Sequence, residues 1–153
     1  MLLSAERYIR FYTLILLLLL TGAASALADP SISGLGNLNF GTWGGSLDMT
    51  AQATACVYRP EGDGTRNYGI SSSSNEGSYV MTSGANTLSY SVDFNGENIP
   101  YSSSPVSFTN ANTVTSDCTS GPVQTVTLTV TAASLGNAKA GLYEGTLVLI
   151  IQP

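Results

Sequence analysis

Apolar and polar residues alternate along several stretches of the chain, and this pattern predicts β-strands. In "TLSYSVDF" (residues 87–94), one face is formed by Leu88, Tyr90, Val92 and Phe94. In "VQTVTLTVTA" (residues 123–132), threonines alternate with Val126, Leu128 and Val130. A period of two over seven or more residues is typical of a strand with one buried face. We expect these apolar faces to line a common core.

Shorter stretches of the same character extend the prediction to a fold class. We expect further strands in "NLNFGTW" (37–43), "SLDMTAQATACVY" (46–58), "NYGISSS" (67–73) and "GSYVMTS" (77–83). Asn95-Gly96 is a strong hairpin-turn signal, and the two glycines within residues 132–141 favour a loop or a single turn there over an amphipathic helix. About seven or eight short strands separated by turns predict one all-β, immunoglobulin-like β-sandwich.

The final segment, "AGLYEGTLVLIIQP" (residues 140–153), reads as a strand that is apolar on both faces toward its end. One face carries Tyr143, Gly145, Leu147, Leu149 and Ile151, and the other carries Leu142, Glu144, Thr146, Val148 and Ile150. Such a strand is usually central and covered, yet no later strand follows in the sequence. We therefore expect an incomplete sandwich that lacks its last strand, with an open sheet edge that can pair with another chain.

The first residues have the pattern of a signal peptide. Arg7 and Arg10 precede the apolar run "FYTLILLLLL", and small residues follow up to an Ala-Leu-Ala site ending at Ala28. The run is too short to span a bilayer, which needs about twenty residues; an uncleaved anchor is the alternative. We expect residues 1–28 to be removed and residues 29–153 to form one exported domain, found first in the periplasm and then at the cell surface.

Charge and cysteine content narrow the picture further. The expected mature chain has three basic and nine acidic residues, so it offers no basic patch to neutralise phosphates, and we expect no nucleic-acid partner. It contains two cysteines, Cys56 and Cys118, which in an exported protein most readily form one disulfide; two free thiols are the alternative. Alternation places Cys56 off the core face unless a bulge shifts the register.

The sequence lacks the residue patterns of the common catalytic sites. The chain has no histidine, which excludes Ser-His-Asp and Cys-His catalysis and the commonest zinc ligand. Its carboxylates are isolated, so we expect no enzyme, no metal and no cofactor. Trp43, Tyr79 and Tyr101 are candidates for a ligand-contact patch, although for Trp43 we favour packing in the sandwich core.

Several short motifs together resemble one family. They are "LNFG" at residues 38–41, "ACVY" around Cys56, "NYGI" around Tyr68, "LSYSV" around Tyr90, a second cysteine at Cys118, and the closing "AGLYEGTLVLIIQP". In this order they resemble the spore coat protein U domain, the subunit fold of archaic chaperone–usher pili.

The resemblance implies a structural role in such a pilus, serving adhesion or biofilm formation. Its subunits lack the final strand, which a periplasmic chaperone and later a neighbouring subunit supply by β-strand addition; the usher is the third expected partner. The residues expected to border the acceptor groove are Tyr143, Leu147, Val148, Leu149, Ile150 and Ile151. Side-chain alternation gives two sets on opposite faces of the strand, Leu147, Leu149 and Ile151 or Val148 and Ile150. The sequence leaves open which set faces the groove.

The expected mature start departs from the family pattern. Only about six residues precede Leu35, including a proline and a glycine, whereas a donor strand needs ten or more. The chain therefore resembles an acceptor more than a donor, which fits a minor or tip-type subunit. The alternative is a stand-alone secreted β-sandwich that binds a carbohydrate or another surface ligand.

Overall fold

The computed structural model describes residues 29–60 and 66–153, so the predicted signal peptide (residues 1–28) lies outside the described part. The regular structure of the described residues is all β-strand apart from one short helix, α2 (Ala132–Asn137). The strands are β1 (Ser31–Ser33), β2 (Met49–Tyr58), β3 (Tyr68–Ser74), β4 (Val80–Ser83), β5 (Asn86–Ser89), β6 (Ser91–Phe94), β7 (Glu97–Asn98), β8 (Val106–Phe108), β9 (Gln124–Val130) and β10 (Leu147–Gln152).

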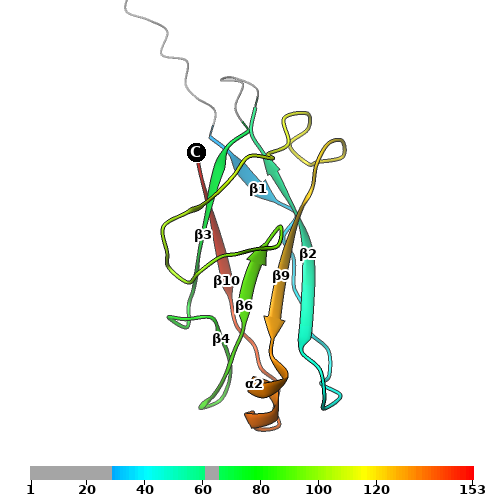
Figure 1. Cartoon of the computed structure of the whole chain (residues 1–153), viewed down its shortest axis with the longest axis vertical. Helices are drawn as coiled ribbons and strands as arrows, with labels where there is room; N and C mark the ends of the chain where they lie inside the picture. Colours follow the sequence, from blue (N-terminus) through cyan, green and yellow to red (C-terminus); the bar gives the residue numbers. More distant parts are fainter. Residues whose placement is uncertain (1–28, 61–65) are drawn as a thin grey trace, which may run out of the picture.

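The strands form two main sheets and one separate hairpin. A five-stranded sheet has the order β1-β2-β9-β6-β7, a three-stranded sheet has the order β10-β3-β8, and β4 pairs with β5. All these pairings are antiparallel. In Figure 1, β3 and β10 lie side by side, next to the layer that contains β6, β9 and β2.

Buried side chains from both sheets form one core. The five-stranded sheet contributes Val57, Val92, Phe94, Val126, Leu128 and Val130, and β3 contributes Tyr68 and Ile70. The Tyr68 ring packs edge-on against Phe94, with ring centroids 6.3 Å apart, and stacks on Phe108 at 5.4 Å. The predicted all-β sandwich is therefore confirmed, because apolar faces of two sheets are buried against each other.

The alternation in residues 87–94 is confirmed, but the single strand predicted there is wrong. The apolar side chains Leu88, Tyr90, Val92 and Phe94 are all buried. The strand nevertheless divides at Tyr90, because β5 pairs with β4 whereas β6 pairs with β9. The predicted turn follows β6: Asn95 and Gly96 both have positive φ values, 52° and 79°, as a type I′ hairpin turn requires.

The strand predicted at residues 37–43 is absent from the structure. The chain instead forms β1, which pairs with β2 from Ser31↔Tyr58 to Ser33↔Cys56, and then continues without regular structure to β2. Leu38 and Phe40 still pack against the core cluster. These side chains are thus partly buried without a strand, since a strand also needs a neighbour for its backbone groups.

The stretch predicted as a loop or a single turn, residues 132–141, contains the six-residue helix α2. Thr131 is its N-cap, and the Oγ1 atom of Thr131 accepts a hydrogen bond of 3.2 Å from the Ser134 amide. Asp48 adds a second bond, in which its Oδ1 atom accepts from the Ala132 amide at 2.7 Å. A capping threonine and an acidic side chain at the first turn favour a helix start. No helix in the described ranges has the length and apolarity of a membrane span.

The disulfide Cys56–Cys118 is confirmed, with an S–S distance of 2.05 Å and a Cα–Cα distance of 5.6 Å. Cys56 is buried but does not belong to the core cluster, in agreement with its predicted place off the core face. The Asn112 side chain orders the loop that carries Cys118: its Oδ1 atom accepts from the Val114 amide at 2.7 Å, and its Nδ2 atom donates to the Ser120 carbonyl at 2.6 Å.

Candidate functional site

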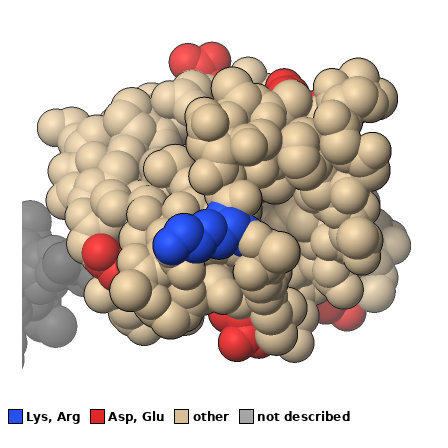
Figure 2. Space-filling view, turned by 90° about the horizontal axis from the view of Figure 1, so that it is seen from below, with Lys and Arg blue, Asp and Glu red and all other residues tan. Residues whose placement is uncertain are grey.

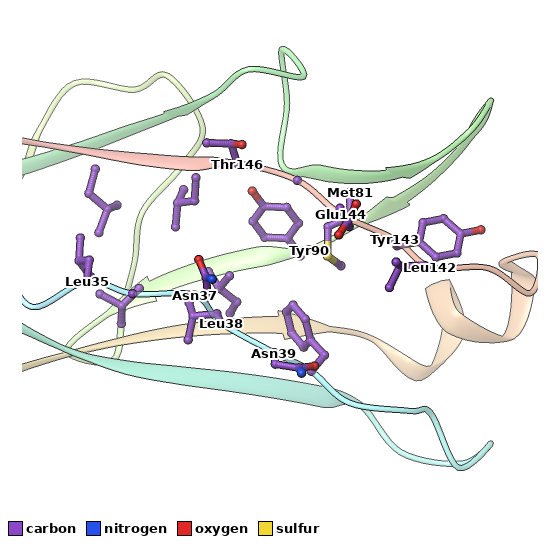
Figure 3. Close-up of a pocket in the computed structure, with 17 residues that line it drawn as sticks. Leu35, Asn37, Leu38, Asn39, Met81, Tyr90, Leu142, Tyr143, Glu144 and Thr146 are labelled. Carbon is purple, nitrogen blue, oxygen red and sulfur yellow. The ribbon is translucent and has the colours of Figure 1, made fainter.

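A groove lies between β10 and the segment of residues 35–40. Its volume is about 590 Å³. The two walls are residues 35–40 and residues 142–147 with Leu149, and the inner surface is formed by Met81, Tyr90, Val126 and Leu128. Figure 3 shows side chains from both walls lying over the strands between them. The volume lies within the range of protein binding sites.

The side chains of β10 alternate between the groove side and the outer face. Leu147, Leu149 and Ile151 are partly buried and packed against the core cluster. Val148 and Ile150 are 39% and 44% exposed. The sequence left open which set faces the groove, and the structure places Leu147 and Leu149 in its lining with Val148 and Ile150 on the other face.

Strand β10 has one paired edge and one unpaired edge. It pairs with β3 along its whole length, from Leu147↔Ser74 to Gln152↔Gly69, and no other strand of the described chain lies beside it. Within the described chain β10 is therefore an edge strand, which agrees with the open sheet edge expected from the sequence. An unpaired edge presents N–H and C=O groups that can pair with another strand.

The wall opposite β10 is also free of strand pairing. After Ser33, the last residue of β1, the chain leaves β2 at Gly34, which has a φ of +81°. Leu35 is 42% exposed, and residues 35–40 belong to no strand. The groove thus lies between an edge strand and a segment that pairs with no strand.

The inner surface of the groove is apolar. Val126 and Leu128 are buried residues of β9, and Tyr90 is 8% exposed. The pKa of Tyr90 is raised to about 12, mainly by burial and further by the nearby Glu76 carboxylate and Tyr79 phenol. Tyr90 is therefore uncharged at neutral pH, and this surface suits aliphatic side chains.

Close contact with β4 fixes the chain just before β10. Thr82 and Glu144 exchange two backbone hydrogen bonds of 2.8 and 3.0 Å. A Cβ atom at Gly145 would lie 2.9 Å from the Val80 carbonyl oxygen, and one at Gly141 would lie 2.5 Å from the Ser83 hydroxyl. Gly145 requires glycine because the backbone of β4 approaches so closely, whereas at Gly141 the Ser83 side chain would have to rotate away.

Tyr143, the first residue predicted to border the groove, lies in the same wall. Its ring is partly buried against the core cluster, and its hydroxyl donates a hydrogen bond of 2.9 Å to the Lys139 carbonyl. Of the residues predicted to border the groove, the structure brings Tyr143, Leu147 and Leu149 into the lining. Ile151 packs on the core beyond the lining, and Val148 and Ile150 are exposed.

The sequence did not predict that residues 35–40 and the inner surface of the groove belong to a site. Leu38 and Phe40 were recognised as apolar, and Tyr90, Val126 and Leu128 were predicted to be buried. Their shared place in one groove depends on contacts between segments far apart along the chain, which no local pattern reports.

The three residues proposed for ligand contact do not form one patch. The rings of Tyr79 and Tyr101 are 5.3 Å apart, and the Tyr79 hydroxyl donates to the Ile99 carbonyl at 2.9 Å. Trp43 instead lies near α2, with its ring 3.8 Å from the place of a Cβ atom on Gly136. Its Nε1 atom donates to the Leu47 carbonyl at 2.9 Å. The preference for Trp43 in the core is wrong, because the ring is partly exposed and outside the core cluster.

Charged side chains do not gather at the end of the molecule that carries α2. Figure 2 views this end and shows a small basic area near the middle, acidic side chains scattered around the rim, and uncharged surface elsewhere. Among the described residues, no group of three or more histidine, cysteine, aspartate or glutamate side chains is placed to hold a metal ion.

Comparison with known proteins gives a structural likeness but no match in sequence. No family model matches the chain, and no curated protein matches it. A chain from a solved structure, described as the chaperone–tip adhesin complex vital for synergistic activation of CFA/I fimbriae biogenesis, superposes with a TM-score of 0.59 at 18% sequence identity. The likeness covers 81% of this chain and 41% of that one, so the chain spans less than half the length of its neighbour. At this identity the likeness shows a shared fold.

Proposed function

We propose that the chain is a structural subunit of a chaperone–usher pilus, with a groove that accepts an extended strand from another protein. The observation that carries this proposal is the free edge of β10 beside a groove with an apolar inner surface. A strand placed there would hydrogen-bond to β10, and its alternate side chains would cover Tyr90, Val126 and Leu128. This is β-strand addition, in which backbone pairing gives affinity and pockets for alternate side chains give specificity.

The fold likeness and the family resemblance support the same role. The neighbouring structure is a chaperone–tip adhesin complex of fimbriae, and the resemblance to the spore coat protein U domain implies strand exchange between subunits. The expected partners are a periplasmic chaperone during export, an usher, and a neighbouring subunit in the fibre. The resulting location is the periplasm and then the fimbria, with adhesion or biofilm formation as the biological outcome and no catalysis.

The place of residues 31–33 supports an acceptor role over a donor role. These residues form β1 and pair with β2 of the same chain, so donating them would break pairing within their own sheet. We therefore assign the chain to a minor or tip-type position in the fibre. Assembly with a repeated subunit that carries a long donor strand would fit this position.

A peptide-binding experiment tests the acceptor groove. The full chain is exported to the periplasm of a bacterial host, purified, and titrated with a labelled peptide of about ten residues in which valines alternate with threonines. We expect binding, measured by fluorescence anisotropy, together with a rise in Tm.

The side-chain alternation of β10 provides a matched pair of variants. Leu149→Asp puts a carboxylate into the groove lining and should weaken binding at least about tenfold, since an unpaired charge loses its hydration there. Val148→Asp makes the same chemical change on the exposed face and should leave affinity within about twofold. A cooperatively folded monomer that does not bind the peptide would contradict the proposed function.

A further inference from the structure

The wall formed by residues 35–40, called the strap below, is held in place very weakly. It belongs to no strand, and within the described residues no backbone–backbone hydrogen bond outside regular structure involves it. A hydrogen bond at the end of the strap joins near neighbours in the chain: the Gly41 amide donates to the Oδ1 atom of Asn39 at 2.8 Å. A segment with so few backbone bonds can open at a small free-energy cost.

Two apolar side chains anchor the strap. Leu38 and Phe40 are partly buried, pack against the core cluster, and line the groove together with Tyr90, Val126 and Leu128. They therefore lie on the surface that the side chains of an incoming strand would use. Leu35, at the start of the strap, is 42% exposed and contributes much less burial.

Glycines with left-handed backbone flank the strap on both sides. Gly34 has a φ of +81° and Gly41 a φ of +78°. A Cβ atom on Gly41 would meet nothing within 4 Å, so packing does not require glycine there. Glycine accepts these dihedral angles and changes them easily, which suits the ends of a moving segment.

We propose that the strap of residues 35–40 gates the groove. In the free protein, Leu38 and Phe40 lie over the apolar inner surface, and the strap moves away about Gly34 and Gly41 before an incoming strand binds. This inference depends on the proposed acceptor function and adds a conformational step to it. Because only the open fraction of molecules accepts a strand, the strap lowers the apparent affinity and the association rate.

Association and dissociation rates of the valine–threonine peptide test the gate. Phe40→Ala weakens the anchor, so we expect an association rate about three to ten times that of the wild type, measured by stopped-flow fluorescence. If the strap were instead a rigid wall, Phe40→Ala would leave the association rate unchanged. It would speed dissociation, because the bound peptide has lost a contact. That result would overturn the gate while leaving the acceptor groove intact.

Controls separate the gate from the fold and from the proposed function. Val148→Ala removes an apolar side chain from the exposed face of β10 and should change neither rate. Leu38→Val, a smaller change, takes the place of Phe40→Ala if the latter does not yield folded protein. Absence of peptide binding to the wild type and to every variant would refute the acceptor function, and the gate with it.

Hydrogen exchange gives a readout without any peptide. In the free wild-type protein we expect the amides of residues 35–40 to exchange far faster than those of β9, since the strap opens without global unfolding. Phe40→Ala should speed exchange in the strap and leave β9 unchanged. Protection of the strap equal to that of β9 would overturn the proposal.

Discussion

At the residue scale, single side chains with one defined role hold the parts of the sandwich together. Cys56 and Cys118 join the outer side of β2 to the loop before β9, and Asn112 orders that loop through side-chain hydrogen bonds. Tyr90 forms part of the groove surface while its ring packs 5.4 Å from that of Tyr79. The disulfide and Tyr90 each lead to a prediction that can be tested by changing a few atoms.

Removing the disulfide should destabilise the protein substantially. The bond joins residues 62 positions apart, so its loss frees a long loop in the unfolded chain, at a typical cost of about 2 to 5 kcal/mol. The double variant Cys56→Ala/Cys118→Ala should show a clearly lower urea midpoint than the wild type. Reduction of the wild type should lower the midpoint similarly, and an unchanged midpoint in both cases would contradict the prediction.

Tyrosine ionisation should make the fold sensitive to strong alkali. Burial raises the pKa of Tyr90 to about 12 in the folded protein, against 10.0 when it is unperturbed. The unfolded chain therefore loses its proton first, so this contribution to stability is complete below pH 10 and is lost progressively between pH 10 and 12.

Urea unfolding at pH 9 and pH 11 measures this loss. Between these two values the wild type should lose roughly 1 kcal/mol of unfolding free energy through Tyr90, and Tyr90→Phe should lose correspondingly less. Burial also raises the pKa of Tyr68, so part of the alkaline loss should persist in the variant. An identical loss in both proteins would show that Tyr90 does not contribute.

At the element scale, two chain segments depend on local features for their position. The approach to β10 is fixed by Gly145 against β4 and by the paired backbones of Thr82 and Glu144. Helix α2 depends on its N-terminal caps, since it has no fully buried residue. It lies at the end of β9 (Figure 1).

The cap of α2 should have a measurable effect on stability. Thr131→Ala removes the Oγ1 acceptor of the Ser134 amide, and loss of such a cap costs about 1 kcal/mol. Thr131→Ser keeps the acceptor and should remain within a few tenths of a kcal/mol of the wild type. The comparison is made by chemical denaturation, and equal destabilisation by both variants would point to packing of the threonine methyl group instead.

At the scale of the whole molecule, the free edge of β10 predicts self-association. Val148 and Ile150 are exposed next to unpaired backbone, and exposed apolar edges tend to pair with other chains. The same edge allows a bound strand to stabilise the fold by mass action.

Both effects can be measured together. Light scattering of the free protein should rise with concentration, and saturating valine–threonine peptide should suppress the rise. At about 100 times its Kd the peptide should also add about 2.7 kcal/mol to the unfolding free energy. The double variant Val148→Lys/Ile150→Lys should associate less than the wild type and still bind the peptide. If self-association persisted at saturating peptide, a surface other than the β10 edge would be responsible for it.

The amino-acid sequence by itself determined the fold class and most of the core. Strict alternation in residues 87–94 and 123–132 identified side chains that are buried in the structure, because a strand has a period of two whatever its partners are. The Asn95-Gly96 turn was equally local, since its positive φ values are an intrinsic preference of these residues. The disulfide followed from the presence of only two cysteines in the expected mature chain.

Only the tertiary structure decided what depends on neighbours. It divided residues 87–94 at Tyr90, left residues 37–43 without a strand, and moved Trp43 out of the core, because strand pairing and burial depend on segments far away in sequence. It also decided which face of β10 lines the groove. Alternation shows that a strand has two faces, but what covers each face is set by the packing of the rest of the chain.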